Sequence, residues 1–228
     1  MESILQESSV QPPQNPDPSA LPPDQLVFTN DWFDNVKGVW EALLPQVQPR
    51  KILEVGSYEG ASACFMVAQL ATLAPIELHC IDTWAGGVDN LDAGTNMGEV
   101  EKRFHHNMGV ALQRALHKVE LVTHKDDSVV AMARLLAQGS AGYFDLVYVD
   151  GSHQAPDVLA DAVLAFKLLR VGGTLVFDDY LWAENLPYGR DPLRCPKLAI
   201  DAFVNCYFRK LQVLRAPLNQ LYVQKTAE

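Results

Sequence analysis

Basic side chains are scarce in this chain of 228 residues, because 18 Lys and Arg stand against 28 Asp and Glu and leave a formal net charge of −10. Lys and Arg never form a run longer than two. A surface with this balance repels both a phosphate backbone and an anionic bilayer. We therefore expect no nucleic-acid partner and no membrane partner.

Long apolar runs are also lacking. The longest uncharged stretch, 60–76, is too short to cross a bilayer and is interrupted by Gln69 and Thr72. No Lys or Arg precedes Lys37, so the first residues do not match a secretory signal peptide. These features predict a cytoplasmic protein.

Cysteine is sparse, and its spacing excludes a disulfide framework or a zinc ribbon. No two cysteines form a CxxC pair, and two of the four lie in apolar runs, where a buried free thiol is the usual state. The four positions are Cys64, Cys80, Cys195 and Cys206. Free thiols agree with a reducing compartment.

Proline is concentrated at the N-terminus, where six of the 14 prolines fall within residues 1–25. Such a segment buries too little apolar surface to offset its ordering entropy, so we interpret 1–25 as a flexible arm. At about 150 residues per domain, the remaining 26–228 form one domain. The arm and the aromatic stripe of Trp32, Phe33 and Trp40 also allow a homodimer, although such a stripe more often belongs to the core.

Short β-branched apolar runs alternate with longer helical patterns from residue 26 onward. The predicted strands are 51–55, 77–81, 119–123, 144–149 and 174–177, with a weaker pair at 208–214 and 220–224. The predicted helices are 61–73, 98–115, 128–138, 156–169 and 197–207, after an amphipathic helix near 32–44. This alternation predicts an α/β fold, a doubly wound, Rossmann-like, mostly parallel seven-stranded sheet with helices on both faces.

A glycine loop follows the first predicted strand. Gly56 permits the tight turn out of the strand, and Gly60 lets the next helix start close to the sheet. The loop amides and the helix N-terminus favour an anionic ligand group. The spacing ExGxxxG lacks the GxGxxG of dinucleotide sites, which disfavours NAD. Asp82, at the end of the second strand, is placed to accept the hydroxyls of a ribose.

Four motifs in order at strand ends carry a family resemblance: ILEVGSYEGAS, HCIDTW, FDLVYVDGSH and GGTLVFDDY. Together they resemble the class I S-adenosylmethionine-dependent methyltransferases. More narrowly, they are similar to the metal-dependent sugar O-methyltransferases of macrolide biosynthesis, with catechol O-methyltransferase as a more distant relative. The resemblance covers about residues 32–225.

The resemblance implies positions for S-adenosylmethionine along the loops. The amino-acid end of the cofactor would lie by the glycine loop, its ribose by Asp82 and its adenine by the turn after the third strand. The implied cofactor residues are Glu54, Gly56, Ser57, Tyr58, Gly60, Ser62, Asp82, Trp84, Asp127, Ser128 and Asp150. Asp127 or Ser128 is also expected to cap the following helix.

Three carboxylates follow neighbouring strands of the predicted sheet, Asp150 after 144–149 and Asp178 with Asp179 after 174–177. Carboxyl ends of adjacent parallel strands converge on one crevice, so these charges meet there. Their repulsion can be relieved by a raised pKa, by a cationic side chain or by a divalent ion. Oxygen ligands favour Mg²⁺ or another hard divalent cation, and the resembled enzymes place their metal ligands at these three positions.

His153 lies three residues after Asp150, where the resembled sugar enzymes carry a proposed histidine base. A near-neutral imidazole suits removal of a proton from a hydroxyl made more acidic by a metal. We therefore expect His153 and Asp150 to be catalytic. Capping of the next helix is the alternative role of His153.

The function predicted is a metal-assisted O-methyltransferase that acts on a small-molecule hydroxyl of a sugar, a polyketide or a catechol-like diol. Substrate choice is assigned to 83–108 and 181–196, the first of which has the composition of a mobile lid. Three alternatives stay open. One is a metal-independent N- or carboxyl-methyltransferase, another is a non-catalytic S-adenosylmethionine-binding protein, and the third is an NAD or nucleotide-sugar enzyme.

Overall fold

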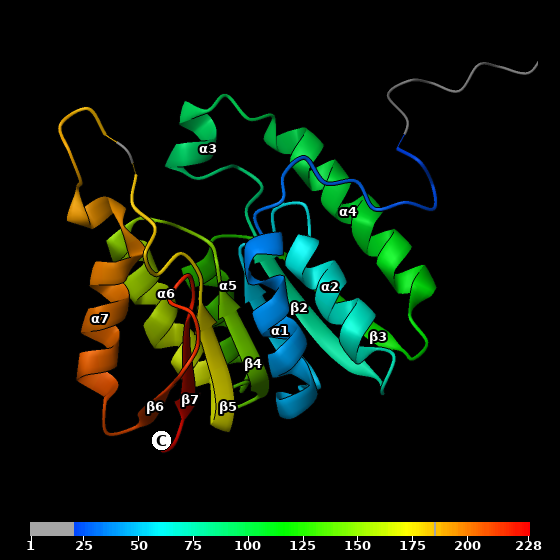
Figure 1. The fold of residues 1–228 in the computed structure, drawn as a ribbon. Helices are drawn as coiled ribbons and strands as arrows, with labels where there is room; N and C mark the ends of the chain where they lie inside the picture. The colour runs from blue at the N-terminus through cyan, green and yellow to red at the C-terminus, as the bar shows by residue number, and fades with distance from the viewer. Residues whose placement is uncertain (1–20, 185) are drawn as a thin grey trace, which may run out of the picture.

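A computed structural model describes residues 21–184 and 186–228. Seven strands form one sheet in the order β3-β2-β1-β4-β5-β7-β6, and only β7 runs antiparallel to its neighbours (Figure 1). The strands are β1 Lys51–Val55, β2 Ile76–Asp82, β3 Val119–Lys125, β4 Phe144–Val149, β5 Leu169–Phe177, β6 Leu211–Leu214 and β7 Leu221–Lys225. The predicted α/β fold is therefore confirmed.

Helices cover both faces of this sheet. They are α1 Asp34–Val47, α2 Ala61–Leu70, α3 Val88–Asp92, α4 Met97–Arg114, α5 Ser128–Ala137, α6 Ala155–Leu168 and α7 Pro196–Tyr207, with a 3₁₀ turn η1 at Pro192–Arg194. Residues of α1, α2 and α4 share one core cluster, and residues of α5, α6 and α7 share the other. The right-handed crossover connections of a parallel sheet place helices on both sides in this way.

Several bounds differ from the sequence predictions: the helix predicted at 61–73 ends at Leu70, and the strand predicted at 208–214 begins at Leu211. The start of β5 and the segment 83–108 differ as well. The strand predicted at 174–177 begins at Leu169, because a register irregularity between Phe144 and Leu146 lets the glycine-containing segment pair with β4. A short helix, α3, lies within the predicted lid at 83–108. The glycines and acidic residues of that segment mask the helical periodicity at the sequence level.

The core is built from the strands and from one face of each covering helix. Trp40 of α1 is fully buried, whereas Trp32 precedes the helix and is 62 % exposed, so the predicted aromatic stripe divides between core and surface. Cys64, Cys80 and Cys195 are buried free thiols, as the surrounding apolar runs predict for the first two.

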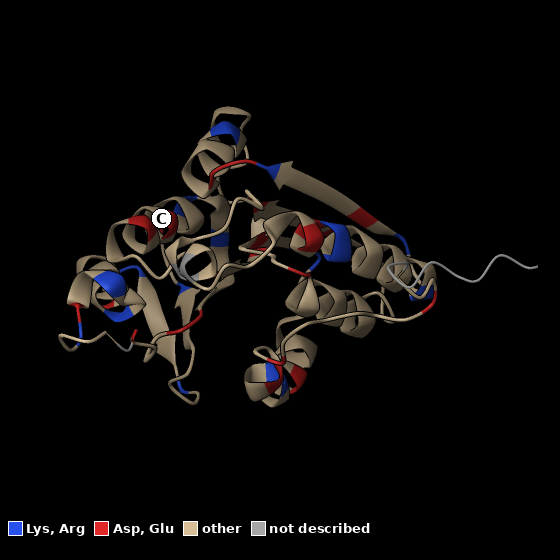
Figure 2. Cartoon of the chain, turned by 90° about the horizontal axis from the view of Figure 1, so that it is seen from above, with Lys and Arg blue, Asp and Glu red and all other residues tan. Residues whose placement is uncertain are grey.

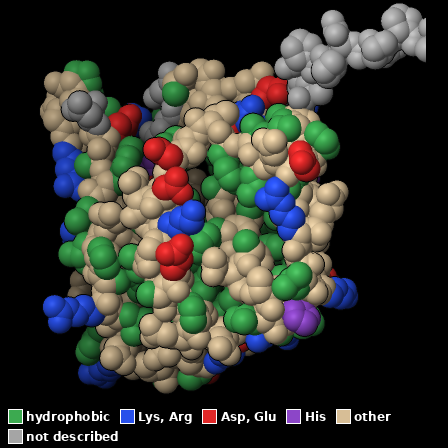
Figure 3. Space-filling view, turned by 45° about the vertical axis from the view of Figure 1, so that its right-hand side comes forward, with side chains coloured by type: hydrophobic (Ala, Val, Ile, Leu, Met, Phe, Trp, Pro, Cys, Tyr) green, Lys and Arg blue, Asp and Glu red, His purple; other side chains and the backbone are tan. Residues whose placement is uncertain are grey.

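Charged residues are scattered over several helices and strand ends, as the view from above shows (Figure 2). On the face in Figure 3, acidic and basic side chains lie among apolar ones. Within the described chain, no helix has both the length and the hydropathy to cross a membrane.

The segment before α1 packs along α4. The carbonyl of Asp24 accepts a hydrogen bond from Arg114, and the Gln25 carbonyl lies 2.8 Å from His106 Nε2. Further on, Glu59 accepts hydrogen bonds from Thr29. Of the predicted arm, residues 21–25 are therefore docked on the domain, and 1–20 lie outside the described residues.

Candidate active site

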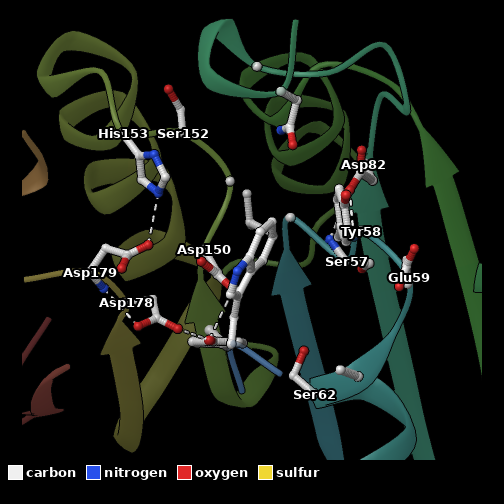
Figure 4. Close-up of a pocket in the computed structure, with 18 of the residues that line it drawn as sticks. Ser57, Tyr58, Glu59, Ser62, Asp82, Asp150, Ser152, His153, Asp178 and Asp179 are labelled. Atoms are coloured by element: carbon white, nitrogen blue, oxygen red, sulfur yellow. Dashed lines mark hydrogen bonds and ion pairs between the residues drawn. The ribbon is translucent and has the colours of Figure 1, made fainter. Parts of the chain in front are cut away.

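A cavity of about 1180 Å³ opens at the carboxyl edge of the sheet, where the loops after β1, β2, β3, β4 and β5 meet. The glycine loop forms one wall, and Asp150, His153, Asp178 and Asp179 form the opposite wall (Figure 4). Adjacent parallel strands of an open sheet create such a crevice where their crossovers leave on opposite faces.

Eight of the predicted cofactor residues line this cavity: Gly56, Ser57, Tyr58, Ser62, Asp82, Asp127, Ser128 and Asp150. Glu54, Gly60 and Trp84 do not line it and lie behind the loops. The three predicted metal residues and His153 all line its other end.

Gly56 is required by a close approach of two loops. Its φ is +85°, and a Cβ there would lie 2.0 Å from the carbonyl oxygen of Asp150. Any other residue would push the loop after β1 away from the loop after β4. The glycine therefore brings the glycine-loop wall and the acidic wall of the cavity together.

Asp82 holds the glycine loop from the end of β2. One carboxylate oxygen accepts the backbone N–H groups of Ser57 at 3.0 Å and Tyr58 at 2.8 Å, and the other accepts the N–H of Trp84 at 2.7 Å. The Trp84 indole N–H in turn donates to the Tyr58 carbonyl at 2.9 Å. Trp84 thus acts as a buried support of the loop, packed on Phe104 with ring centroids 4.8 Å apart.

Glu54 supports the same loop from below. It is fully buried, and its two oxygens accept hydrogen bonds from Ser57 Oγ and Ser62 Oγ, both at 2.5 Å. Burial raises the pKa of the Glu54 carboxyl, and these two hydroxyl donors oppose that rise. The interaction ties the end of β1 to the first turn of α2.

In the loop after β3, which also lines the cavity, Asp127 caps α5. Its side chain accepts the backbone N–H groups of Val129 and Val130, as predicted for a capping residue there. Beside it, Ser128 Oγ donates to Asp161 of α6 at 2.6 Å. Burial raises the pKa of the Asp161 carboxyl to about 7.

His153 is held from two sides. Its Nε2 lies 2.8 Å from Asp179 Oδ2, and its ring stacks on Trp182 with centroids 3.9 Å apart and planes 26° apart. Trp182 is itself fixed by a backbone hydrogen bond to the Asp179 carbonyl at 2.9 Å. A histidine paired with a carboxylate in a cavity is the arrangement of an oriented general base.

Tyr148 joins the remaining two acids. Its hydroxyl lies 3.1 Å from Asp150 Oδ2 and donates to Asp178. Asp150 faces the cavity although protein surrounds it on the other sides, and this enclosure raises the pKa of its carboxyl, with the charges of Asp178 and Asp179 adding to the rise. Enclosure and the charge of Asp179 likewise raise the pKa of Asp178.

One observation favours a hard divalent cation between these acids, and another disfavours it. Three carboxylates on one cavity wall supply the oxygen chemistry that Mg²⁺ requires, and their mutual repulsion favours a positive charge between them. Their arrangement gives no ready ligand set, because no group of three or more His, Cys, Asp or Glu side chains among residues 21–184 and 186–228 is placed to hold a metal ion. The predicted magnesium site is thus not confirmed.

Sequence reasoning missed several residues of the site, among them Tyr148 and Asp161, which line the cavity, and Gln220, which contacts Asp178 from the core. Tyr148 carries a usable signal, because it lies two positions before Asp150 on β4 and so points to the same face of the sheet. Asp161 lies on a helix face without a distinguishing pattern. Gln220 lies 72 positions from Tyr148 in sequence, and nothing in its neighbours marks it.

Comparisons with known proteins agree with this geometry. Residues 53–180 match the family described as "Methyltransferase domain". An uncharacterized protein of Acanthamoeba polyphaga mimivirus is 28 % identical over 130 residues, which are 56 % of this chain and 50 % of that protein. A "probable caffeoyl-CoA O-methyltransferase 3" of Dictyostelium discoideum is 25 % identical over 168 residues, 70 % of this chain and 59 % of that protein. The chain thus spans only part of the length of these relatives.

Solved structures share the fold at low sequence identity. An O-methyltransferase from Bacillus cereus in complex with SAH has a TM-score of 0.59 at 16 % identity, covering 88 % of this chain and 84 % of that one. The O-methyltransferase TomG from Streptomyces achromogenes in complex with SAM has a TM-score of 0.56 at 18 % identity, covering 85 % and 80 %. The family match spans more than half of the chain and includes both walls of the cavity, so the protein belongs to the methyltransferase domain family and has the fold of the class I S-adenosylmethionine-dependent methyltransferases.

Proposed function

We propose that the protein is an S-adenosylmethionine-dependent O-methyltransferase that methylates a hydroxyl group of a small molecule. The observation that carries this proposal is the continuity of one cavity from the glycine loop to the His153–Asp179 pair. Relatives and structural neighbours whose names or titles specify O-methyltransferases support oxygen as the acceptor atom.

The cofactor end would be held by the glycine loop, by Asp82 and by the N-terminus of α5. A cofactor bound there supplies an electrophilic methyl group on a sulfonium. The chain's contribution is orientation, because Asp82 and Glu54 lock the loop on which the cofactor would lie. Orientation of two reactants contributes up to about 7–11 kcal/mol to such a displacement.

At the acceptor end, His153 takes the proton of the acceptor hydroxyl. Asp179 accepts a hydrogen bond from the ring, orients it and stabilises the positive charge that the ring gains. Trp182 covers one face of the imidazole and limits its rotation. His153 lies on the cavity wall opposite the glycine loop. An acceptor hydroxyl bound between the two walls would therefore have the base on one side and the cofactor on the other.

We include a hard divalent cation in this proposal, held by Asp150, Asp178 and Asp179. Bound there, it would lower the pKa of the acceptor hydroxyl. The support is the chemistry of the three carboxylates and the repulsion among them. A competing candidate is transfer without a metal, which is favoured by the protein donors that these carboxylates already have, Tyr148 and His153.

The test measures S-adenosylhomocysteine release with catechol and a methyl glycoside bearing adjacent hydroxyls as probe acceptors. We expect turnover that EDTA abolishes and Mg²⁺ restores, and a loss of about 100-fold or more in His153→Ala. His117→Ala, which removes an exposed histidine, is the matched control and should retain full activity. Full turnover after EDTA treatment would reject the role of the metal but not the methyltransferase activity. Full turnover in His153→Ala would reject the role of His153 as the base.

A further inference from the structure

A buried chain of polar side chains crosses the core behind the acidic wall of the cavity. It begins at Trp40 of α1, passes through Gln220 just before β7, and ends at Tyr148 of β4 and Asp178. Trp40 and Tyr148 are fully buried, and Gln220 is 1 % exposed. These residues come from four segments that are distant in sequence: α1, β4, the end of β5 and the start of β7.

The orientation of the Gln220 amide is determined by its partners. Its Oε1 accepts hydrogen bonds from the Trp40 indole N–H at 2.8 Å and from the Tyr222 hydroxyl. Both of these groups act as donors here, so the oxygen must face them and the NH₂ group must face the other way. The amide nitrogen therefore points to Asp178 Oδ2 at 3.0 Å and to the Tyr148 hydroxyl at 3.3 Å.

Tyr148 receives a direction from the same arrangement. Because the Gln220 nitrogen donates to its oxygen, the Tyr148 hydroxyl hydrogen is directed to the carboxylates of Asp150 and Asp178. Its ring is held edge-to-face by Trp40, with centroids 4.9 Å apart. Asp178 thus accepts from the Gln220 amide and from the Tyr148 hydroxyl, and that hydroxyl also lies 3.1 Å from Asp150.

Packing alone does not account for this chain. A buried amide and a buried phenol are costly unless every polar atom finds a partner, and an apolar side chain of the same size would fill the space without that cost. Here both ends of the Gln220 amide are satisfied, and the last acceptors are acids that line the cavity. Each donor in the chain points to the next residue on the way to those acids, from Trp40 to Gln220 and from Gln220 to Tyr148 and Asp178.

We propose that Gln220 and Tyr148 are positioning residues that hold Asp178 beside Asp150 for methyl transfer. This inference rests on the proposed function, because it assigns the residues that arrange its acceptor end. The hydrogen bonds that Gln220 and Tyr148 donate lead to the acidic wall of the cavity, whereas the glycine loop is held by Asp82 and Glu54. Removing either one changes where the Asp178 carboxylate lies and lowers the rate of the chemical step, while binding at the glycine loop is unaffected.

The experiment compares Tyr148→Phe and Gln220→Met with Tyr143→Phe. Tyr143 is the matched control, because its hydroxyl also donates to a carboxylate, Glu77 at 2.8 Å, but lies just before β4, at the opposite end of that strand. Crystal structures of the variants should show Asp178 displaced from Asp150 in Tyr148→Phe and Gln220→Met only. With the probe acceptors, kcat should fall about tenfold or more in these two variants, while the S-adenosylmethionine Kd stays within about twofold.

The inference is overturned by an unmoved Asp178 in both variants, or by a kcat within about twofold of the wild-type value when Asp178 has moved. If Gln220→Met does not fold, Tyr148→Phe decides, because it removes one oxygen and leaves the ring packing and the amide contact to Asp178 in place. If the wild-type protein releases no S-adenosylhomocysteine with any acceptor, the proposed function fails. The position of Asp178 in the variant crystals then decides this inference alone.

Discussion

The carboxylate of Asp82 accepts the backbone N–H of Ser57 at 3.0 Å, so the end of β2 holds the loop that follows β1. The same oxygen accepts the N–H of Tyr58. A residue predicted as a ribose acceptor is therefore also the anchor of the glycine loop. Cofactor affinity and loop order should depend on the same carboxylate.

Asp82→Ala should weaken S-adenosylmethionine binding by more than about tenfold, because the loop loses a charged acceptor for its amides. Asp145→Ala is the matched control, since Asp145 accepts the amides of Arg50 and Lys51 at 2.7 and 2.9 Å, beside the start of β1. Both variants should lose about 1–3 kcal/mol of unfolding free energy. Calorimetric titration and urea denaturation measure the two effects, and equal loss of cofactor affinity in both variants would contradict the assignment.

Asp161 should make the protein less stable as pH rises toward neutrality. Burial raises the pKa of its carboxyl to about 7, so the folded chain keeps this proton at pH values where the unfolded chain has already released it. Stability from this group is fully present below the ordinary Asp pKa, falls as pH rises to about 7 and is then constant.

Asp161→Asn removes that titration while its side-chain oxygen can still accept the Ser128 hydroxyl. The unfolding free energy of the variant relative to wild type should therefore rise by about 2–3 kcal/mol between pH 5 and pH 8. Urea denaturation at both pH values provides the measurement. Parallel pH profiles for the two proteins would show that the Asp161 carboxyl is ionised in the folded state at pH 5.

Trp182 should contribute to turnover through its stacking on His153. Trp182→Ala frees the imidazole to rotate away from Asp179, and a misplaced base lowers kcat by roughly 10–100-fold. Trp182→Phe retains an aromatic face and should keep kcat within about threefold of wild type. Steady-state kinetics with the probe acceptors separates the variants, and equal kcat values for both would remove the positioning role of the ring.

Thiol labelling should report the burial of the cysteines. Cys206 is exposed, whereas Cys64, Cys80 and Cys195 are buried. Burial raises the pKa of Cys64 to about 12 and that of Cys80 well above its ordinary value, which suppresses their thiolates. Native protein should react rapidly at one thiol and denatured protein at four. Loss of the fast phase in Cys206→Ser would identify Cys206 as the reactive thiol. A fast phase of two or more thiols would contradict the burial of the other three cysteines.

Much of the fold is readable from local sequence. The strands at 51–55 and 144–149 were predicted with their observed bounds, because each is a β-branched apolar run that ends at a glycine or an acid. The first half of β5 escaped prediction, because Gly172 and Gly173 indicate a turn by themselves. Gly173 lies where a Cβ would be 2.9 Å from the Asp145 carbonyl, so this glycine is required by strand contact.

Local patterns of residues specify the succession of strands and helices along the chain, the glycine loop and the position of Asp150, Asp178 and Asp179 at strand ends, because hydrophobic periodicity and turn chemistry are local properties. The partners of those acids follow from the packing of distant segments instead. Tyr148 and Gln220 reach Asp178 because β4 and β7 pair with the two sides of β5, and His153 pairs with Asp179 because two loops converge. Such hydrogen bonds depend on distances between segments far apart in the chain, which no local pattern specifies.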